Sequence, residues 1–448
     1  MHAYIRHVAE RFDLRRDIEL ETRIEAARFD PDDDLWTVTT TGAVAGTVNA
    51  RWLILGVGCL SSEHVPPFPG RDDFRGEVHH TVRWPADGVD VTGKRVGVVG
   101  TGSSAIQSIP LLAEEAAELF VFQRTPNYVV PAQNRPITDD EMAAVRADYS
   151  GLRDRARERP TGYLFPFNPT SVLDATDEER FAQLETYWEI GGLQFLGAFG
   201  DILTNAEANR LVTEYWQRKV RDIVDDPTTA ELLIPDGDVF GGKRLCAGTN
   251  YYETYNRENV TLVDVSSTPI TGFTERGLRR DDEIELDVVV LATGFHAMTG
   301  SVVRMDIAGP TGLTMAEKWS DGPHNYLGLM INGFPNLFNL QGPGSPSVFV
   351  TMVAGIEHQM DWIVECLSTM RDAGRTSIEP TAVAEQQWVA EVARVAEPTL
   401  RSKVDSWYTG ANIPGKARIF MPWIGGFPAY REHCQAVIDD GWRGFEFG

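Results

Sequence analysis

Two short stretches of the sequence carry residue types that could bind phosphate or stabilise negative charge. The first is Gly100-Thr101-Gly102-Ser103-Ser104-Ala105, which fits the pattern G-x-G-x-x-G/A. In this pattern the first glycine permits a tight turn, the second lets the backbone approach a pyrophosphate, and the last small residue lets helix and strand pack closely. The second stretch is Lys243-Arg244, which follows two glycines. Charged residues usually lie on solvated surfaces, so the residue types alone favour a surface position for this pair.

The residues around the glycine turn predict the elements that would position it. VGVV (96–99) predicts a strand before the turn, AIQSIPLLAEEAAEL predicts a helix after it, and LFVFQ (119–123) predicts the next strand. Strand, turn, helix and strand form one βαβ unit. The helix N-terminus would offer free N–H groups and a partial positive charge to phosphates. We therefore predict a dinucleotide site at residues 100–104; the alternative is a turn in the same fold that binds nothing.

The end of the second strand indicates which dinucleotide binds. An NAD site usually has Asp or Glu about 20 residues after the glycines, where the carboxylate binds the ribose 2′-hydroxyl. Here the strand ends in Gln123-Arg124-Thr125, without an acid. Arg124 can make a bidentate contact with a 2′-phosphate, and Thr125 can add a hydroxyl donor. The sequence therefore favours NADP over NAD; the alternative for Arg124 is an ordinary surface arginine.

Length, charge and cysteine usage limit the classes of protein. The 448 residues predict two or three domains, and 42% hydrophobic with 24% charged residues is the balance of a globular protein. A net charge of −24 argues against general binding to nucleic acids or anionic membranes. The four cysteines have no CxxC or metal-like spacing, which argues against a zinc module or disulfide framework and favours the reducing cytoplasm. No apolar run reaches the ~18 residues of a membrane span, and MHAYIRHVAERFDLRRD lacks the apolar core of a signal peptide.

The remaining segments predict an α/β protein with two Rossmann-like, dinucleotide-binding domains and a helical insertion. Strands are predicted at 35–40, 48–58, 260–265 and 284–295. LILGVG and VVLATG are similar strand-to-glycine endings, which favours two related nucleotide-binding folds. From 131 to 240 the sequence predicts mostly helix, with capping boxes at Thr138-x-x-Glu141 and Thr176-x-x-Glu179.

A longer pattern relates the sequence to a known family. Phe74-x-Gly76-x-x-x-His80-x-x-x-Trp84-Pro85 matches the fingerprint FxGxxxHxxxWP of type I Baeyer–Villiger monooxygenases at every fixed position. Further stretches that resemble cyclohexanone monooxygenase and its relatives follow in order: GKRVGVVGTGSSAIQSIP, FVFQRTPNY, GGKR, YYETYNRENV, VLATGFHAMTG, GFPNLFNLQGPGSPS and SWYTGANIPGK. The resemblance implies a flavoprotein with FAD and NADPH. It would insert one oxygen atom of O2 next to a ketone carbonyl through a flavin C4a-peroxide, giving an ester or lactone.

The same resemblance assigns roles to individual residues. The active-site arginine of the family falls on Arg244, where a guanidinium that stays protonated could stabilise the peroxide. Lys243 matches a residue implicated in holding the cofactor 2′-phosphate, and Trp407 matches a tryptophan that contacts the nicotinamide cofactor. His80 is expected to act through conformation rather than as an acid or base. Further residues expected to bind cofactor are Gln107, Thr293, Gly294, Gly344 and Ser345, the last two in the turn Gly342–Ser347 at the flavin pyrimidine edge.

The resemblance also implies a division into domains. Residues 1–86 are expected to be the remainder of the FAD-binding domain with the linker fingerprint, 87–130 and 241–292 the NADP-binding domain, 131–240 the helical insertion, and 293–448 the C-terminal part of the FAD domain with the substrate pocket. Phe349, Met352 and Trp423 are expected to give this pocket an apolar wall that suits cyclic or aromatic ketones.

One motif of the family does not occur in this sequence. The family begins with its own G-x-G-x-x-G turn for the ADP part of FAD, and this chain has none before residue 100. We expect an FAD domain that lacks its first βαβ unit, either because Met1 is not the natural start or because the chain is a genuine, impaired fragment. Two alternatives stay open: a flavin N- or S-hydroxylating monooxygenase, and a non-catalytic NADPH-binding remnant. The sequence indicates neither the particular ketone nor the oligomeric state.

Overall fold

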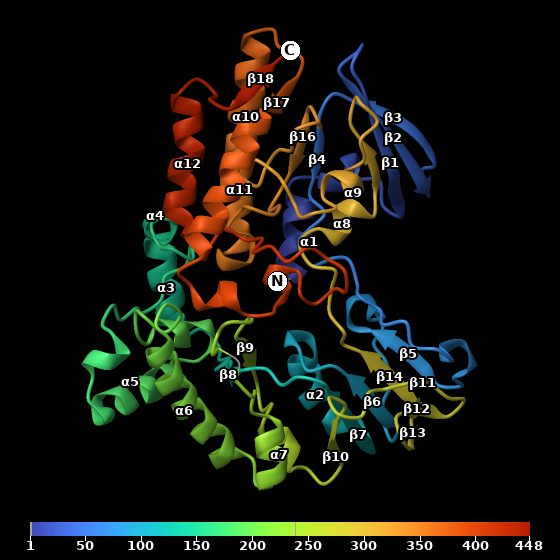
Figure 1. Ribbon diagram of the computed structural model, residues 1–448, viewed down its shortest axis with the longest axis vertical. Coiled ribbons are helices and arrows are strands. Elements are labelled where there is room, and N and C mark those ends of the chain that lie inside the picture. Colours follow the sequence, from blue (N-terminus) through green and yellow to red (C-terminus); the bar gives the residue numbers. More distant parts are fainter. Residues whose placement is uncertain (1, 238) are drawn as a thin grey trace. The chain divides into compact units, whose positions relative to one another are not determined.

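The computed structural model describes residues 2–237 and 239–448, which divide into two compact units (Figure 1). Unit 1 contains residues 2–59, 298–393 and 421–448, and unit 2 contains the rest of the described chain. Compactness alone does not identify a cofactor, so the FAD and NADP segments stay predictions. No helix in the described ranges has both the length and the apolar character that crossing a bilayer requires.

Unit 1 is built on two small sheets. In the larger sheet β1 (Thr22–Asp30), β2 (Leu35–Gly42) and β3 (Gly46–Ala50) are antiparallel neighbours, and β15 (Asp306–Ala308) runs parallel to β1. The smaller sheet pairs β4 (Leu53–Leu55) in parallel with β16 (Leu337–Asn339). The two sheets share one core, which includes Trp36, Leu53, Phe334 and Leu337.

The strand predicted at 35–40 is confirmed as β2, but the strand predicted at 48–58 is wrong as a single element. β3 ends at Ala50 and pairs with β2, whereas β4 begins at Leu53 and pairs with β16. The change of partner between them depends on tertiary pairing, which the apolar run alone does not reveal.

The helices of unit 1 gather in its C-terminal segments, apart from α1 (His2–Arg11). α10 (Met352–Asp372) and α12 (Phe427–Asp439) lie side by side (Figure 1), joined by a hydrogen bond of 3.2 Å from Trp362 Nε1 to the carbonyl oxygen of Cys434. The other elements are α8 (Gly300–Val303), α9 (Met315–Lys318), the start of α11 (Ala382–Ala396), and the antiparallel pair β17 (Ile378–Pro380) and β18 (Phe445–Phe447).

Unit 2 is built on a parallel sheet with the strand order β10-β7-β6-β14-β5. Its strands are β5 (Glu77–His80), β6 (Arg95–Val99), β7 (Glu118–Gln123), β10 (Val260–Asp264) and β14 (Val288–Leu291). α2 (Ser103–Glu115) connects β6 to β7, which confirms the predicted βαβ unit. β6 and β14 are buried along most of their length, as expected for central parallel strands.

The strand predicted at 260–265 is confirmed as β10, but the strand predicted at 284–295 is two strands. β13 (Glu283–Glu285) ends a small antiparallel sheet with β11 (Gly272–Phe273) and β12 (Gly277–Arg279), and β14 then enters the parallel sheet. The sequence between them contains no glycine or proline to mark the break.

Helices fill the segment between β8 (Val129–Pro131) and β9 (Cys246–Gly248), which pair in parallel. The described part of this segment holds α3 (Asp139–Ala147), α4 (Tyr149–Arg157), α5 (Asp177–Ile190), α6 (Ala206–Ile223) and α7 (Pro227–Leu232). Both predicted capping boxes are confirmed: in each, the threonine hydroxyl accepts from the N–H of the glutamate and the glutamate carboxylate accepts in return.

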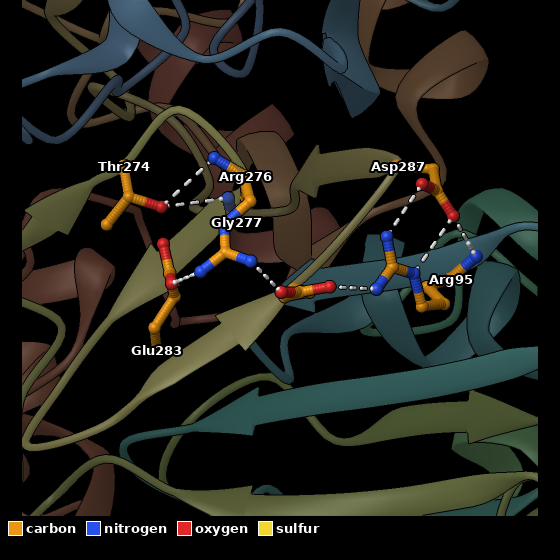
Figure 2. Close-up of polar contacts among 7 residues, drawn as sticks. Arg95, Thr274, Arg276, Gly277, Glu283 and Asp287 are labelled. Atoms are coloured by element: carbon orange, nitrogen blue, oxygen red, sulfur yellow. Dashed lines mark hydrogen bonds and ion pairs between the residues drawn. The ribbon is translucent and has the colours of Figure 1, made fainter.

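Figure 2 shows an ion-pair network that joins the parallel sheet of unit 2 to the small antiparallel sheet β11-β12-β13. Arg95 of β6 binds Asp287 through its backbone N–H at 2.8 Å and its guanidinium at 3.0 Å, and it reaches Glu285 of β13 at 2.7 Å. Arg276 pairs with Glu285 and with Glu283, the latter at 2.6 Å. The hydrogen bonds from Arg95 hold the pKa of Asp287 below its usual range.

We expect Asp287→Asn to lower the free energy of unfolding by about 1 kcal/mol at pH 7, because the partners of this carboxylate are half-exposed. The lowered pKa means that the ionised form stabilises the fold above the unfolded pKa, and that this contribution is lost as pH falls through the folded pKa. Thermal unfolding should therefore show a midpoint about 2 °C lower for the variant at pH 7, and this difference should shrink as the pH falls below the usual pKa range of an aspartate. The control is Asp281→Asn, which removes an exposed carboxylate from the turn between β12 and β13. An equal shift in that control would contradict the prediction.

Candidate active site

The glycine turn has the geometry of a phosphate-binding loop. Gly100 has φ +110°, and a Cβ there would lie 2.6 Å from the carbonyl oxygen of Ala292, so the position requires glycine. Gly102 is the N-cap of α2 and no side chain caps the helix. A Cβ at Gly102 would meet nothing within 4 Å among the described residues. The first N–H groups of α2 thus have no capping side chain and are available to an anion.

The side chains of the turn make several bonds within the protein. Thr101 is buried and its hydroxyl donates to the carbonyl oxygen of Thr125 at 2.9 Å, which brings Thr125 beside the loop. Ser103 Oγ lies 3.1 Å from Cys246 Sγ. Gln107 Nε2 donates to the carbonyl oxygen of Ser103 at 3.1 Å, and the exposed position of Gln107 leaves its amide accessible. The phosphate contacts of Ser103 and Ser104 stay predictions.

Arg124 lies at the C-terminal end of β7, where the sequence predicts recognition of the 2′-phosphate. It follows the last residue of β7, is exposed, and has no ion-pair or hydrogen-bond partner among the described residues. A guanidinium in this position is available for a bidentate contact with a phosphate.

Arg244 is brought close to the phosphate loop by a residue that the sequence did not single out. The thiol of Cys246 donates to the carbonyl oxygen of Arg244 at 3.4 Å, and its sulfur lies 3.1 Å from Ser103 Oγ. Burial raises the pKa of Cys246, so the thiol stays protonated and acts as a neutral bridge. Lys243 and Arg244 are half-buried, which is not the surface position that their residue types alone favour.

Trp407 lies beside a buried tyrosine that the sequence also did not single out. The ring centroids of Trp407 and Tyr408 are 4.2 Å apart. Tyr408 is fully buried, and burial raises its pKa, while the guanidiniums of Arg401 and Arg244 lower it. Tyr408 thus lies between Trp407, the predicted nicotinamide contact, and Arg244, the predicted catalytic residue. The one sequence signal for Tyr408 is its position directly after Trp407 in the stretch SWYTGAN.

The segment that carries Trp407 is tied to the chain after β14. Asn412 Nδ2 donates to the carbonyl oxygen of Phe295 at 2.7 Å, and Lys416 Nζ donates to that of Ala297 at 2.7 Å. Burial lowers the pKa of Lys416 to about 8. These bonds place Trp407 and the predicted cofactor residues Thr293 and Gly294 on connected parts of unit 2.

Thr293 contacts the histidine of the fingerprint. Its hydroxyl donates to the carbonyl oxygen of His64 at 2.6 Å and lies 3.3 Å from His80 Nε2. His80 Nδ1 accepts from the N–H of Val82 at 3.2 Å, and burial lowers the pKa of the imidazole. A neutral His80 with both ring nitrogens engaged supports a structural or coupling role. Gly294 has φ +83° and nothing within 4 Å of an added Cβ, so its backbone is open to a flat ligand.

Gly344 and Ser345 lie in unit 1, in a tightly packed turn. The N–H of Gly344 donates to the carbonyl oxygen of Met421 at 2.7 Å, and a Cβ there would lie 2.8 Å from Asn325 Oδ1. Ser345 is fully buried and its hydroxyl donates to the carbonyl oxygen of Gly342 at 2.7 Å. The side chain of Ser345 is thus engaged within the turn.

The predicted apolar wall stays a prediction for Phe349 and Met352, and Trp423 is not placed as expected. Phe349 and Met352 are half-buried, whereas Trp423 is 2% exposed and stacks on Trp388 with ring centroids 5.1 Å apart. Trp423 therefore belongs to the core of unit 1 rather than to an open wall, because a second tryptophan covers its face.

Comparisons with known proteins identify the family. A family model described as flavin-binding monooxygenase-like matches residues 1–140. A Baeyer–Villiger monooxygenase of Pseudooceanicola batsensis is 40% identical over 98% of this chain and 80% of its own length. This chain belongs to the Baeyer–Villiger monooxygenase family. A solved structure of this family, oxidised steroid monooxygenase bound to NADP, is 47% identical and superposes with a TM-score of 0.93 over 99% of this chain and 84% of its own.

A similar relative carries the name of a different reaction. Phenazine N-monooxygenase of Lysobacter antibioticus is 38% identical over 99% of this chain and 82% of its own length. The α/β fold with dinucleotide-binding units that was predicted is confirmed by these similarities, because they cover nearly the whole chain at high TM-score.

Proposed function

We propose that this protein is an NADPH-dependent flavin monooxygenase that converts a ketone into an ester or lactone. The observation that carries the proposal is Arg244, held next to the glycine turn through Cys246 in a chain of this family. The overall change is balanced as ketone, O2, NADPH and a proton giving ester, water and NADP⁺.

Residues of unit 2 would hold NADPH. The open N-terminus of α2, with Gly100 and Gly102 in the turn, suits the pyrophosphate. Arg124, Thr125 and Lys243 would bind the 2′-phosphate, and the ring of Trp407 would contact the nicotinamide end. These groups fit NADPH because they combine a helix N-terminus that no side chain caps with cationic side chains and no acidic residue in the first turn of α2.

Within unit 2, Thr293 and Gly294 are proposed as cofactor-binding residues. Within unit 1, Gly344 and Ser345 are proposed as flavin-binding residues. The open backbone of Gly294 fits a flat ring system that approaches closely. When both cofactors are bound, NADPH supplies a hydride and the reduced flavin activates O2. We propose the cofactor domains with the boundaries predicted from the sequence.

The chemical role of this chain's residues is to hold charge and to exclude water. The Arg244 guanidinium stays protonated, so it can stabilise the negative charge that develops on oxygen when a carbonyl carbon is attacked. Burial keeps Tyr408 neutral, so its hydroxyl adds no competing negative charge beside Arg244. Trp407, Tyr408 and Phe420 form an aromatic cluster next to Arg244, which suits a dry site.

The test is product analysis with the purified, FAD-supplemented protein, NADPH and ¹⁸O2. We expect cyclohexanone to give a lactone that carries one ¹⁸O atom, with one NADPH oxidised for each lactone formed. Oxidation of NADPH without any ester or lactone, over a panel of cyclic, aromatic and linear ketones, would refute the proposal.

A second candidate is oxygenation of a nitrogen atom, which the similarity to the phenazine N-monooxygenase favours. Competition between a ketone and a tertiary amine or an aromatic N-heterocycle in one reaction would separate the two. An N-oxide as the main product would favour this candidate, whereas a lactone or ester as the main product would favour the first.

We also propose a cytoplasmic location. All four cysteines are free and buried, which suits a compartment that keeps thiols reduced.

A further inference from the structure

A second arginine lies behind the turn that carries Arg244. Arg401 belongs to a short 3-10 helix, η8 (Leu400–Lys403), in unit 2. Its Nε donates a hydrogen bond of 2.9 Å to the carbonyl oxygen of Gly241. Gly241 begins the stretch Gly241-Gly242-Lys243-Arg244, so this bond joins η8 directly to the backbone that leads to Arg244.

The packing around this bond leaves the two glycines little room to move. Gly241 has φ +72°, and a Cβ there would lie 3.0 Å from Leu196 Cδ2 and 3.1 Å from Leu203 Cδ2. A Cβ on Gly242 would lie 2.9 Å from Val404 Cγ2, next to η8. The N–H of Leu400 donates to the carbonyl oxygen of Leu203 at 2.9 Å, so η8 and the glycines dock on the same neighbours.

Tyr408 connects Arg401 and Arg244 from the other side. Both guanidiniums act on its buried hydroxyl, and its ring packs on Trp407. The segment is itself rigid, because Ser406 Oγ accepts from the N–H of Tyr408 at 3.2 Å and the carbonyl oxygen of Thr409 accepts from the N–H of Ile419 at 3.2 Å. Arg401 thus lies where the Trp407 segment meets the Arg244 turn.

Placing Arg401 here is unfavourable by itself. Burial lowers the pKa of Arg401, and the neighbouring charge of Arg244 lowers it further. A fold that needed only packing at this point could use an uncharged side chain of similar size. The hydrogen bond to Gly241, together with the electrostatic influence of the guanidinium on Tyr408, gives Arg401 a more specific role.

We propose that Arg401 is a positioning residue, which holds the Arg244 guanidinium in place through the Gly241 carbonyl and Tyr408. The inference rests on the proposed role of Arg244 in ketone oxygenation. Arg401 contacts neither substrate nor cofactor in this scheme. It acts on Arg244 by keeping the turn docked and by fixing the tyrosine beside it.

The test compares Arg401→Gln and Arg401→Lys with Lys403→Gln, which removes an exposed positive charge from the same 3-10 helix. Arg401→Gln should lower kcat for ester formation about 10-fold or more, because a small misplacement of a catalytic group costs at least this much. KM for NADPH should stay within about twofold of wild type, and NADPH oxidation without product should rise. Arg401→Lys, which keeps a charged donor near Gly241, should recover part of the rate, and Lys403→Gln should match wild type.

Hydrogen–deuterium exchange gives a readout that is independent of activity. The N–H of Gly242 donates to the carbonyl oxygen of Val239 at 2.9 Å. The peptide with residues 241–246 should exchange faster in Arg401→Gln, because loss of the docking bond to Gly241 should let this turn open more often. The strands of the parallel sheet should keep the exchange of wild type. Tyr408→Phe, which keeps the ring, should show the same local effect and serves as the test if Arg401→Gln is unfolded by circular dichroism.

Two results would overturn the inference. One is an Arg401→Gln protein that matches Lys403→Gln in kcat for ester formation, in the share of NADPH oxidised without product, and in hydrogen–deuterium exchange of residues 241–246. The other is faster exchange throughout unit 2, which would mean a general loss of stability. Arg244→Ala in the same series separates this inference from the proposed function: ester formation that survives Arg244→Ala refutes the function, whereas loss there with wild-type behaviour in Arg401→Gln refutes only the positioning role.

Discussion

Replacing Arg244 by alanine is expected to lower kcat for ester formation by about 100- to 1,000-fold, the usual effect of removing one donor that stabilises a developing oxyanion. Alanine supplies neither the positive charge nor the N–H donors of the guanidinium. The phosphate loop does not depend on the Arg244 side chain, because the bridge to Ser103 runs through the backbone carbonyl oxygen of Arg244 and the thiol of Cys246. NADPH should therefore still bind and be oxidised, with its electrons lost to peroxide.

The measurement is simultaneous recording of NADPH consumption, ester or lactone by gas chromatography, and hydrogen peroxide. Arg244→Lys tests geometry, since an ammonium keeps the charge but not the planar fork, and it should restore at most a small part of the rate. Arg279→Ala is a matched control, because it removes an exposed arginine at the end of β12 in the same unit. Unchanged ester formation in Arg244→Ala would rule out the assigned role.

Replacing Arg124 by alanine should lower kcat/KM for NADPH by about 30- to 100-fold and leave kcat/KM for NADH nearly unchanged. A bidentate, charge-assisted contact with a phosphate is worth about 2–3 kcal/mol, and only NADPH carries the 2′-phosphate. Arg124 makes no ion pair with the described residues, so its removal should not disturb the fold.

Steady-state kinetics with both coenzymes, at several salt concentrations, checks this expectation. The preference for NADPH should also weaken with salt in the wild type, since Arg124 is exposed and its charge is screened. Asn127, whose side chain donates to the carbonyl oxygen of Thr101 at 2.7 Å, gives a contrasting variant: Asn127→Ala should impair both coenzymes because it loosens the loop itself. Equal losses for NADPH and NADH in Arg124→Ala would exclude recognition of the 2′-phosphate by this residue.

Predictions from the sequence agree with the structure where the interacting residues are close together in the chain, and fail where the partners are far apart. The capping boxes at Thr138 and Thr176 were predictable because donor and acceptor lie three residues apart. The βαβ unit with its glycine turn was predictable because the turn, the helix start and the flanking strands are consecutive. The strands expected at 48–58 and 284–295 were each divided in two, since a strand ends where its partner changes and the partners lie elsewhere in the chain.

The sequence by itself determined the family, the glycine turn and the residue types at the candidate site, because these depend on local order and on motifs that span a few residues. Tertiary structure alone decided that Cys246 meets Ser103 across 143 residues and that Arg401 meets Gly241 across 160. Such contacts arise when packed strands and helices bring distant backbone together, and no periodicity or spacing encodes them. The residue types of Lys243 and Arg244 favoured a position on the surface. Tertiary packing instead leaves both side chains half-buried, with Arg244 beside the buried Tyr408.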